Sequence, residues 1–237
     1  AGACLAYAAM VRIFPLLFFF GPAVVALRET IQKPRGKRRV PRWAIDFALG
    51  AALAVFLSFA AGCLTGRGPA AWSEFASHIQ QHEKTWLTNN VGFKNVVLYD
   101  TATFRREGVD FSLPEPWIHW QAKMDGLAQS RRPLIWLGQG VLLLLIGATA
   151  WRLDAQRAAM LGPAVIFTML LTTCYYWQML LVVPLLKSRR LLYGVLALNL
   201  GLHALHFATE SFEMRYGLMS WGLLVMYGVF LAPFVVE

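Results

Sequence analysis

The run "LIWLGQGVLLLLIGATAW", residues 134–151, decides the fold, because it carries no charged side chain. Runs of about 18 or more apolar residues are long enough to cross the hydrocarbon core of a membrane as a helix. A second run, "GLLVMYGVFLAPFVV" (222–236), has the same character, and the chain is 57% hydrophobic and 15% charged. Soluble domains average roughly 45–50% apolar and about 25% charged residues. The sequence therefore predicts an all-α, polytopic integral membrane helical bundle.

The distribution of charge predicts how the first half of the chain is oriented. Residues 28–42 contain seven Lys and Arg side chains and one acid, and short loops this basic stay in the cytoplasm. We therefore expect the apolar segment 3–27 to end inside and the segment 43–64 to return outward. The polar stretch 65–133 has eight basic and seven acidic residues. It is predicted to be an extracytoplasmic loop domain, with an amphipathic helix over 69–87.

The second half contains one ambiguous segment. After the span at 134–151, residues 159–187 fit either one long helix or a hairpin that bends near "TTCYYWQ" (172–178). The charge rule favours the hairpin, because it returns the basic residues at 187–190 to the inside. Spans at 191–209 and 217–236 follow, which makes six or seven in all. The predicted parts are 1–64, with two membrane helices and the basic loop, then 65–133, and then 134–237.

The net charge of +9 raises the question of partners. The basic residues cluster at the ends of predicted spans, which is the positive-inside pattern, so we expect membrane lipids as partners and no nucleic acid. The predicted location is the bacterial cytoplasmic membrane. The sequence contains no Walker loop, HExxH or GxSxG motif of soluble enzymes.

Arg12 interrupts the apolar stretch "AYAAMVRIFPLLFFFGP" (6–22). Charged residues within spans are rare, and are by default functional or paired. On one continuous helix with a rise of 1.5 Å per residue, Arg12 lies about 22 Å from the inner end of the span, in the outer part of the bilayer. Three interpretations remain open: a side chain that snorkels to the interface, a partner for a carboxylate on another helix, and a binding site for a lipid phosphate.

His203 and His206, in "GLHALHFATE", share one helical face because three residues separate them. Their predicted depth is similar to that of Arg12. Without a third ligand at fixed spacing, this pair does not specify a metal or haem site, so we expect no metal and no cofactor. The remaining interpretations are hydrogen bonding between helices and a polar lining for a headgroup cavity.

The segment "TTCYYWQ" (172–178) places hydroxyls, aromatic rings and an amide at the predicted outer surface. One interpretation is an aromatic belt at the interface. The other is a platform for a sugar, because pyranose rings stack on aromatic faces and amides bond their hydroxyls. The candidate sugar-binding residues are Tyr175, Tyr176, Trp177 and Gln178.

Three segments together resemble the C-type membrane glycosyltransferases, whose donors are polyprenyl-phosphate sugars. "VRIFPLLFFFGPAVVALRE" (11–29) is similar to a span with a basic residue shortly before proline. "WSEFASHIQQHEKTWLTNNVGF" (72–93) is similar to an extracytoplasmic helix rich in Trp and Phe that precedes an Asn-containing turn. "LLTTCYYWQMLLVVPLLKSRR" (170–190) resembles a late hairpin with a polar aromatic motif at the outer face.

This resemblance implies that a sugar moves from a polyprenyl phosphate to a lipid or protein acceptor at the outer face. It assigns Arg12 to the donor phosphate and Tyr175, Tyr176 and Trp177 to the neighbourhood of the sugar. The match covers the C-terminal half of such an enzyme, and the catalytic carboxylate of the family would precede residue 1. Because the first apolar run starts without a polar lead-in, we expect the chain to be a fragment. The alternative is a non-catalytic membrane subunit or scaffold, with 65–133 docking on other membrane subunits.

Overall fold

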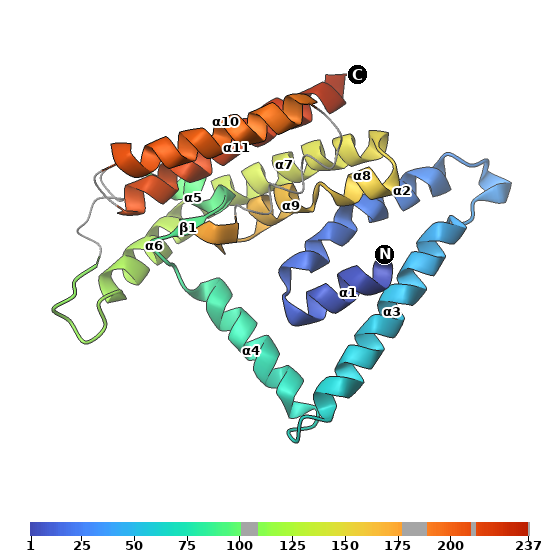
Figure 1. Ribbon diagram of the computed structural model, residues 1–237, viewed down its shortest axis with the longest axis horizontal. Coiled ribbons are helices and arrows are strands. Elements are labelled where there is room, and N and C mark those ends of the chain that lie inside the picture. Colours follow the sequence, from blue (N-terminus) through green and yellow to red (C-terminus); the bar gives the residue numbers. More distant parts are fainter. Residues whose placement is uncertain (101–108, 177–188, 210–211, 237) are drawn as a thin grey trace. The chain divides into compact units, whose positions relative to one another are not determined.

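The computed structural model describes residues 1–100, 109–176, 189–209 and 212–236, and these are mostly helical (Figure 1). The chain divides into two compact units. Unit 1 comprises 1–84 and 147–162, and unit 2 comprises 85–146 and 163–237. Three segments in the described part are long and apolar enough to span a membrane: Phe14–Ile31, Arg42–Cys63 and Arg132–Arg152. The prediction of a mostly helical chain with helices able to span a membrane is thus confirmed, and the total of six or seven spans stays a prediction.

The first apolar segment of unit 1 is not one continuous helix, so the predicted bounds 3–27 are wrong, although one candidate span, Phe14–Ile31, remains in this region. Helix α1 (Gly2–Val11) ends at Arg12, whose backbone is extended with φ −145° and ψ 126°. A 3₁₀ turn, η1 (Phe14–Phe19), and then helix α2 (Phe20–Ile31) follow. Pro15 explains the break, because a proline inside a helix lacks the N–H group and clashes with the carbonyl four residues earlier. That carbonyl belongs to Val11, the last residue of α1.

Helix α3 (Arg42–Cys63) matches the predicted span over 43–64 and packs against α1 through small residues. A Cβ added to Gly2 would overlap the carbonyl of Phe47, and one added to Gly50 would lie 3.5 Å from the backbone nitrogen of Ala3. Small residues allow such close backbone approach between membrane helices, where dispersion contacts drive association. The Phe19 ring packs edge-on against Phe47, with centroids 5.2 Å apart.

The end of α2 is joined to the end of α7 (Arg132–Arg152). Arg28 donates hydrogen bonds to the carbonyl oxygens of Trp151, at 2.5 Å, and Leu153, at 3.0 Å. The last carbonyls of a helix lack partners within the helix, and a cation at this end also interacts favourably with the helix dipole. The contact joins two segments, around 28 and 152, that the charge pattern assigns to the same side of the membrane.

We expect Arg28→Met to lower the free energy of unfolding by about 1.5–3 kcal/mol, because it removes charge-assisted hydrogen bonds to otherwise unpaired carbonyls. The measurement is denaturant unfolding of the purified protein in detergent micelles. The matched control is Arg42→Met, since Arg42 is exposed and lies 4.0 Å from Asp46; exposed pairs contribute about 0–1 kcal/mol. Equal losses in both variants would contradict a capping role for Arg28.

Unit 2 is built around a short antiparallel strand pair. β1 (Asn90–Val91) pairs with β2 (Thr172–Thr173), with Asn90 opposite Thr173 and Val91 opposite Thr172. Helix α11 (Phe212–Val236) contacts β1 and also α5 (Phe93–Leu98). Figure 1 shows α10 (Arg189–Ala208) and α11 lying side by side.

The predicted loop domain over 65–133 contributes to both units. The amphipathic helix expected at 69–87 is observed as α4 (Ala70–Lys84) in unit 1. Its Trp72 ring stacks on Phe59 of α3, with centroids 5.7 Å apart, and donates to the Phe59 carbonyl at 3.0 Å. An aromatic residue of the predicted stripe therefore packs on protein at the end of α3.

Residues 85–133 belong to unit 2, where a hydrophobic core forms around α6 (Ile118–Ser130). The Trp86 backbone carbonyl accepts from the Gln121 amide nitrogen at 2.5 Å, and the Trp86 backbone N–H donates to the Gln121 amide oxygen at 2.8 Å. The Trp86 indole donates to the Asp125 carboxylate at 2.7 Å. The buried side chains of this core are Trp86, Leu98, Trp120, Met124 and Ile135.

The segment over 159–187 is interrupted, so the alternative of one long helix is wrong. Helix α8 (Ala155–Ala159) is followed by α9 (Gly162–Met169), and the chain then enters β2. Eight residues of helix extend only about 12 Å, too short to cross a hydrocarbon core of about 30 Å. The second arm of the predicted hairpin, 177–188, lies outside the described residues.

Candidate functional site at the paired strands

Two sequence segments that lie far apart in the chain meet at the strand pair of unit 2. They are "TNNVGF" (88–93) and "TTCYY" (172–176), and β1 and β2 join them. The Thr172 hydroxyl donates to the Val91 carbonyl at 3.0 Å, and the Asn89 amide lies 3.8 Å from the Cys174 sulfur. Asn90 and Thr172 are buried. The pairing therefore places a polar backbone junction in the interior of a helical unit.

The turn that carries β1 is fixed by its own side chains. The Asn90 carboxamide oxygen accepts from the Leu87 backbone at 2.6 Å, and the Asn95 amide donates to the Asn90 carbonyl. Asn side chains form such local bonds readily, which explains their preference for turns. The Gly92 backbone then donates to the Ser220 hydroxyl of α11 at 3.3 Å. The Asn bonds therefore fix the conformation of the turn, and the Gly92 bond attaches the turn to α11.

The end of α9 is stabilised by Gln139, which interrupts the apolar run of α7. Its amide nitrogen donates to the carbonyls of Thr168, at 2.9 Å, and Met169, at 3.4 Å. Backbone groups in a membrane interior have no water to bond, so a broken helix requires partners within the protein. Sequence reasoning missed this residue. The available signal was an amide inside a run that is otherwise apolar.

Replacing Gln139 with Leu is expected to lower the free energy of unfolding by about 1–3 kcal/mol, because the partly buried carbonyls of Thr168 and Met169 lose this hydrogen-bond donor. Thermal unfolding of the protein in detergent micelles measures this loss. Gln129→Leu serves as the control, because Gln129 is exposed on α6, and surface substitutions usually change stability by no more than about 0.5 kcal/mol. A Gln139→Leu protein that is as stable as wild type would show that the amide does not cap α9.

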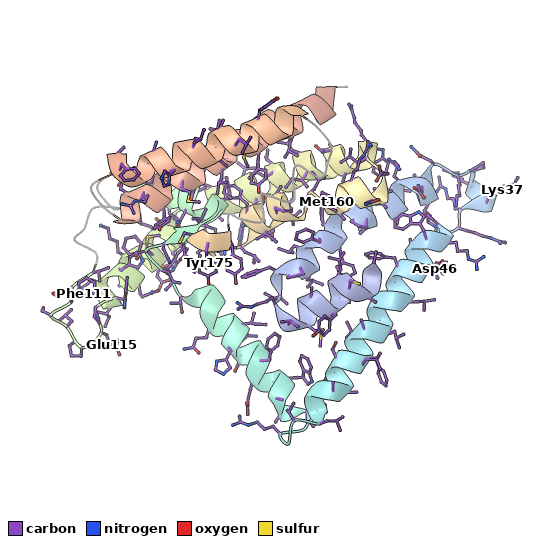
Figure 2. The ribbon with its side chains drawn as sticks, in the orientation of Figure 1. Lys37, Asp46, Phe111, Glu115, Met160 and Tyr175 are labelled. Atoms are coloured by element: carbon purple, nitrogen blue, oxygen red, sulfur yellow. The ribbon has the colours of Figure 1, made fainter. Side chains whose placement is uncertain are left out.

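The predicted sugar-binding residues follow β2 directly. The Tyr175 side chain is exposed and that of Tyr176 is half-buried, and their ring centroids lie 4.7 Å apart. The structure therefore joins both tyrosines to the Asn-containing turn through the strand pair. Figure 2 labels Tyr175. Trp177 and Gln178 lie outside the described residues.

The interactions described for the other predicted residues do not involve the strand pair. His203 is exposed on α10, and its ring packs edge-on against Phe207 of the same helix, at 5.4 Å. His206 lies on the same helix, and its side chain is outside the description. Arg12 belongs to unit 1, so a shared pocket of Arg12 with the histidines and tyrosines stays a prediction.

The break at Arg12 changes the estimate of its depth. The distance of about 22 Å assumed one continuous helix. Arg12 instead precedes the candidate span Phe14–Ile31, at the end opposite Arg28 and the basic loop. It is exposed there. A cation just outside a span can reach headgroup phosphates at less cost than one in the middle of a hydrocarbon core.

Tyr99 and Asp110 are polar groups of unit 2 whose pKa values are shifted. Burial raises the pKa of Tyr99, with the neighbouring Asp100 as a second cause. Hydrogen bonds from the hydroxyl and the backbone amide of Ser112 lower the pKa of Asp110. Asp110 precedes Phe111 in a loop that also carries Glu115, and Figure 2 labels Phe111 and Glu115. None of the interactions described above joins Tyr99 or Asp110 to the strand pair.

Among residues 1–100, 109–176, 189–209 and 212–236, no group of three or more His, Cys, Asp or Glu side chains could hold a metal ion. Comparison of the chain with protein-family models, curated proteins and solved structures finds no match. The functional assignment therefore depends on the chemistry of the residues themselves.

Proposed function

We propose that the protein acts in a membrane glycosyltransferase that moves a sugar from a polyprenyl phosphate to a lipid or protein acceptor at the outer face. One observation supports this proposal most strongly. Two of the three segments that resemble the C-type enzymes, the Asn-containing turn and the polar aromatic motif, are paired strand to strand. Segments that form one site should be held together in this way, and their separation in sequence makes the contact informative.

The tyrosines supply the proposed sugar contact. Tyr175 is 55% exposed and stands beside Tyr176, so an aromatic face is available to a pyranose ring. The segment that carries the two rings is held by hydrogen bonds: the Thr172 hydroxyl donates to the Val91 carbonyl of β1, and the Gln139 amide donates to the Thr168 carbonyl before β2. Binding sites gain affinity when their contact groups are held in place before the ligand arrives.

Arg12 supplies the proposed phosphate contact. A guanidinium binds phosphate oxygens through charge-assisted, often bidentate, hydrogen bonds. During transfer it would stabilise the negative charge that develops on the leaving phosphate. A carboxylate acting as general base on the acceptor hydroxyl would complete the chemistry.

The test is binding of undecaprenyl phosphate to the purified protein, followed by native mass spectrometry. We expect Arg12→Ala to weaken binding at least about tenfold, equivalent to about 1.4 kcal/mol, and Arg12→Lys to weaken it less, because the charge remains. The matched control is Arg67→Ala, since Arg67 is an exposed arginine paired with Glu74. Undiminished binding by Arg12→Ala would contradict the proposed role.

A second measurement distinguishes binding of the sugar from binding of the phosphate. Tyr175→Ala should weaken binding of the glycosylated lipid and leave binding of the bare polyprenyl phosphate unchanged. Equal loss for both ligands would assign Tyr175 to the lipid or to the fold.

The alternative function, a non-catalytic membrane subunit, is favoured by the surface of α3. None of its residues is fully buried, and several of its large apolar side chains are exposed. Such a surface suits either lipid or a neighbouring membrane subunit. Co-purification of a stoichiometric membrane partner, together with no binding of polyprenyl phosphate, would establish this alternative.

A further inference from the structure

The turn between α2 and α3 concentrates positive charge at one end of unit 1. We define the basic turn as residues 33–39, which include a short 3₁₀ segment, η2 (Arg35–Lys37). Apart from Lys33, which is half-buried, its cationic residues are exposed. They are Lys33, Arg35, Lys37, Arg38 and Arg39.

The acids that lie near this end of unit 1 are already paired with other arginines. The pairs are Glu29 with Arg28 at 3.6 Å, Asp46 with Arg42 at 4.0 Å, and Asp154 with Arg157 at 3.3 Å. None of the ion pairs found within the described part of the chain includes a cation of the basic turn. Its positive charge is therefore not neutralised by those acids.

The basic turn is folded by its own hydrogen bonds. The Lys33 ammonium donates to the Arg39 carbonyl at 3.0 Å, and the Arg38 guanidinium donates to the Lys33 carbonyl at 3.4 Å. These two bonds close the turn. Arg35, Lys37 and Arg39 are exposed around it, and Figure 2 labels Lys37 at its tip.

Exposed apolar side chains flank the basic turn on both helices. Leu27 and Ile31 of α2 are 55% and 45% exposed, and Val40, just before α3, is 52% exposed. Both flanking segments, Phe14–Ile31 and Arg42–Cys63, are candidate membrane spans. Apolar side chains next to a cluster of cations are suited to the boundary between the acyl chains and the headgroups of a bilayer.

We propose that the basic turn binds the phosphate groups of anionic phospholipids on the side of the membrane where α2 ends. Clusters of four to eight Lys and Arg next to a membrane span attract anionic lipids, and guanidinium groups bind phosphate through several donors. The flanking spans keep the turn at the membrane surface, which favours a lipid headgroup over nucleic acid as its ligand. This proposal does not depend on the proposed glycosyltransferase function.

The experiment is a lipid titration of the full chain in detergent, with bound lipids counted by native mass spectrometry. Phosphatidylglycerol and cardiolipin are compared with phosphatidylcholine. The test variant is Arg35→Gln/Lys37→Gln/Arg39→Gln. It keeps the side chains of Lys33 and Arg38, which donate the hydrogen bonds that close the turn. The matched control is Arg67→Gln/Lys94→Gln/Lys123→Gln, which removes the same charge from residues 65–133. A third variant, Arg35→Lys/Arg39→Lys, retains the charge.

For wild type we expect saturable binding of the two anionic lipids and at least tenfold weaker binding of phosphatidylcholine. The triple Gln variant of the turn should lose about tenfold or more in affinity for the anionic lipids, while the control and the Lys variant keep most of it. Equal losses in the turn and control variants would overturn the proposal, because binding would then follow net charge alone. Equal binding of phosphatidylcholine, or displacement of the lipid by millimolar inorganic phosphate, would overturn it as well.

Discussion

Gly21→Ala is expected to destabilise the protein by about 3 kcal/mol or more, which is at the upper end of the effects of single substitutions. Gly21 lies on α2 where α8 crosses it, and an added Cβ would overlap the carbonyl group of Ala158. The obstacle is backbone, so no side-chain rotation can relieve it. The two helices would have to separate, which would also weaken the contact of Phe18 with Gly162 and the cap that Arg28 places on α7.

The measurement is the free energy of unfolding in detergent micelles, and the matched control is Gly140→Ala. Gly140 also lies in an apolar helix, and nothing is within 4 Å of an added Cβ there. Alanine in a helix interior is more favourable than glycine by roughly 0.5–1 kcal/mol, so the control should be as stable as wild type or more stable. If Gly21→Ala matched the control, the close approach of α2 and α8 would not exist in solution.

The sequence predicted the elements whose signal is local. The predicted span at 43–64 agrees with α3 to within one residue at each end. The agreement is close because a continuous apolar run follows a basic segment and a proline, so both ends of the helix are marked in the sequence. The amphipathic stripe of α4 was likewise evident from its spacing. The break at Arg12 was missed, although Pro15 marked it, because the composition on both sides of Arg12 is equally apolar.

The candidate site depends on contacts that local patterns do not contain. The charge rule favoured a bend in 159–187, and the helix does end at Met169. The pairing of Thr172 and Thr173 with Asn90 and Val91 joins residues about eighty positions apart. No periodicity reports such a contact. The resemblance to known enzymes selected both segments separately, but the backbone pairing between them required the structure.

The same distinction explains why the sequence pointed to Tyr175 as a candidate but not to Gln139. An exposed aromatic motif at a predicted bend is visible in the sequence as a cluster of chemically rich residues. A single amide in an apolar run has meaning only when its acceptors are known, and these are the carbonyls of Thr168 and Met169 at the end of another helix. A residue such as Gln139, which stabilises the end of another helix, is therefore harder to predict from sequence than the exposed aromatic residues that follow that helix end.

The second large effect is expected at Gly92, the residue that links β1 to α5. Its φ of +158° lies in a region that is essentially restricted to glycine, with a cost of about 1–3 kcal/mol for other residues. An added Cβ would also lie 2.5 Å from the Leu170 carbonyl oxygen, just before β2. Gly92→Ala should therefore push the two strands apart and lower the free energy of unfolding by about 2–4 kcal/mol.

Hydrogen–deuterium exchange gives a local readout of this change. In Gly92→Ala the amides of β1 and β2 should exchange faster than in wild type, while the amides of α3 in unit 1 keep their protection. Gly126→Ala is the matched control, because Gly126 lies in α6 with nothing within 4 Å of an added Cβ. If the strand pair forms part of the sugar site, Gly92→Ala should also weaken binding of the glycosylated lipid. Unchanged exchange at β1 and β2 would show that the strand pair does not depend on Gly92. Faster exchange at the strands together with normal binding of the glycosylated lipid would show that the strand pair is not part of the sugar site.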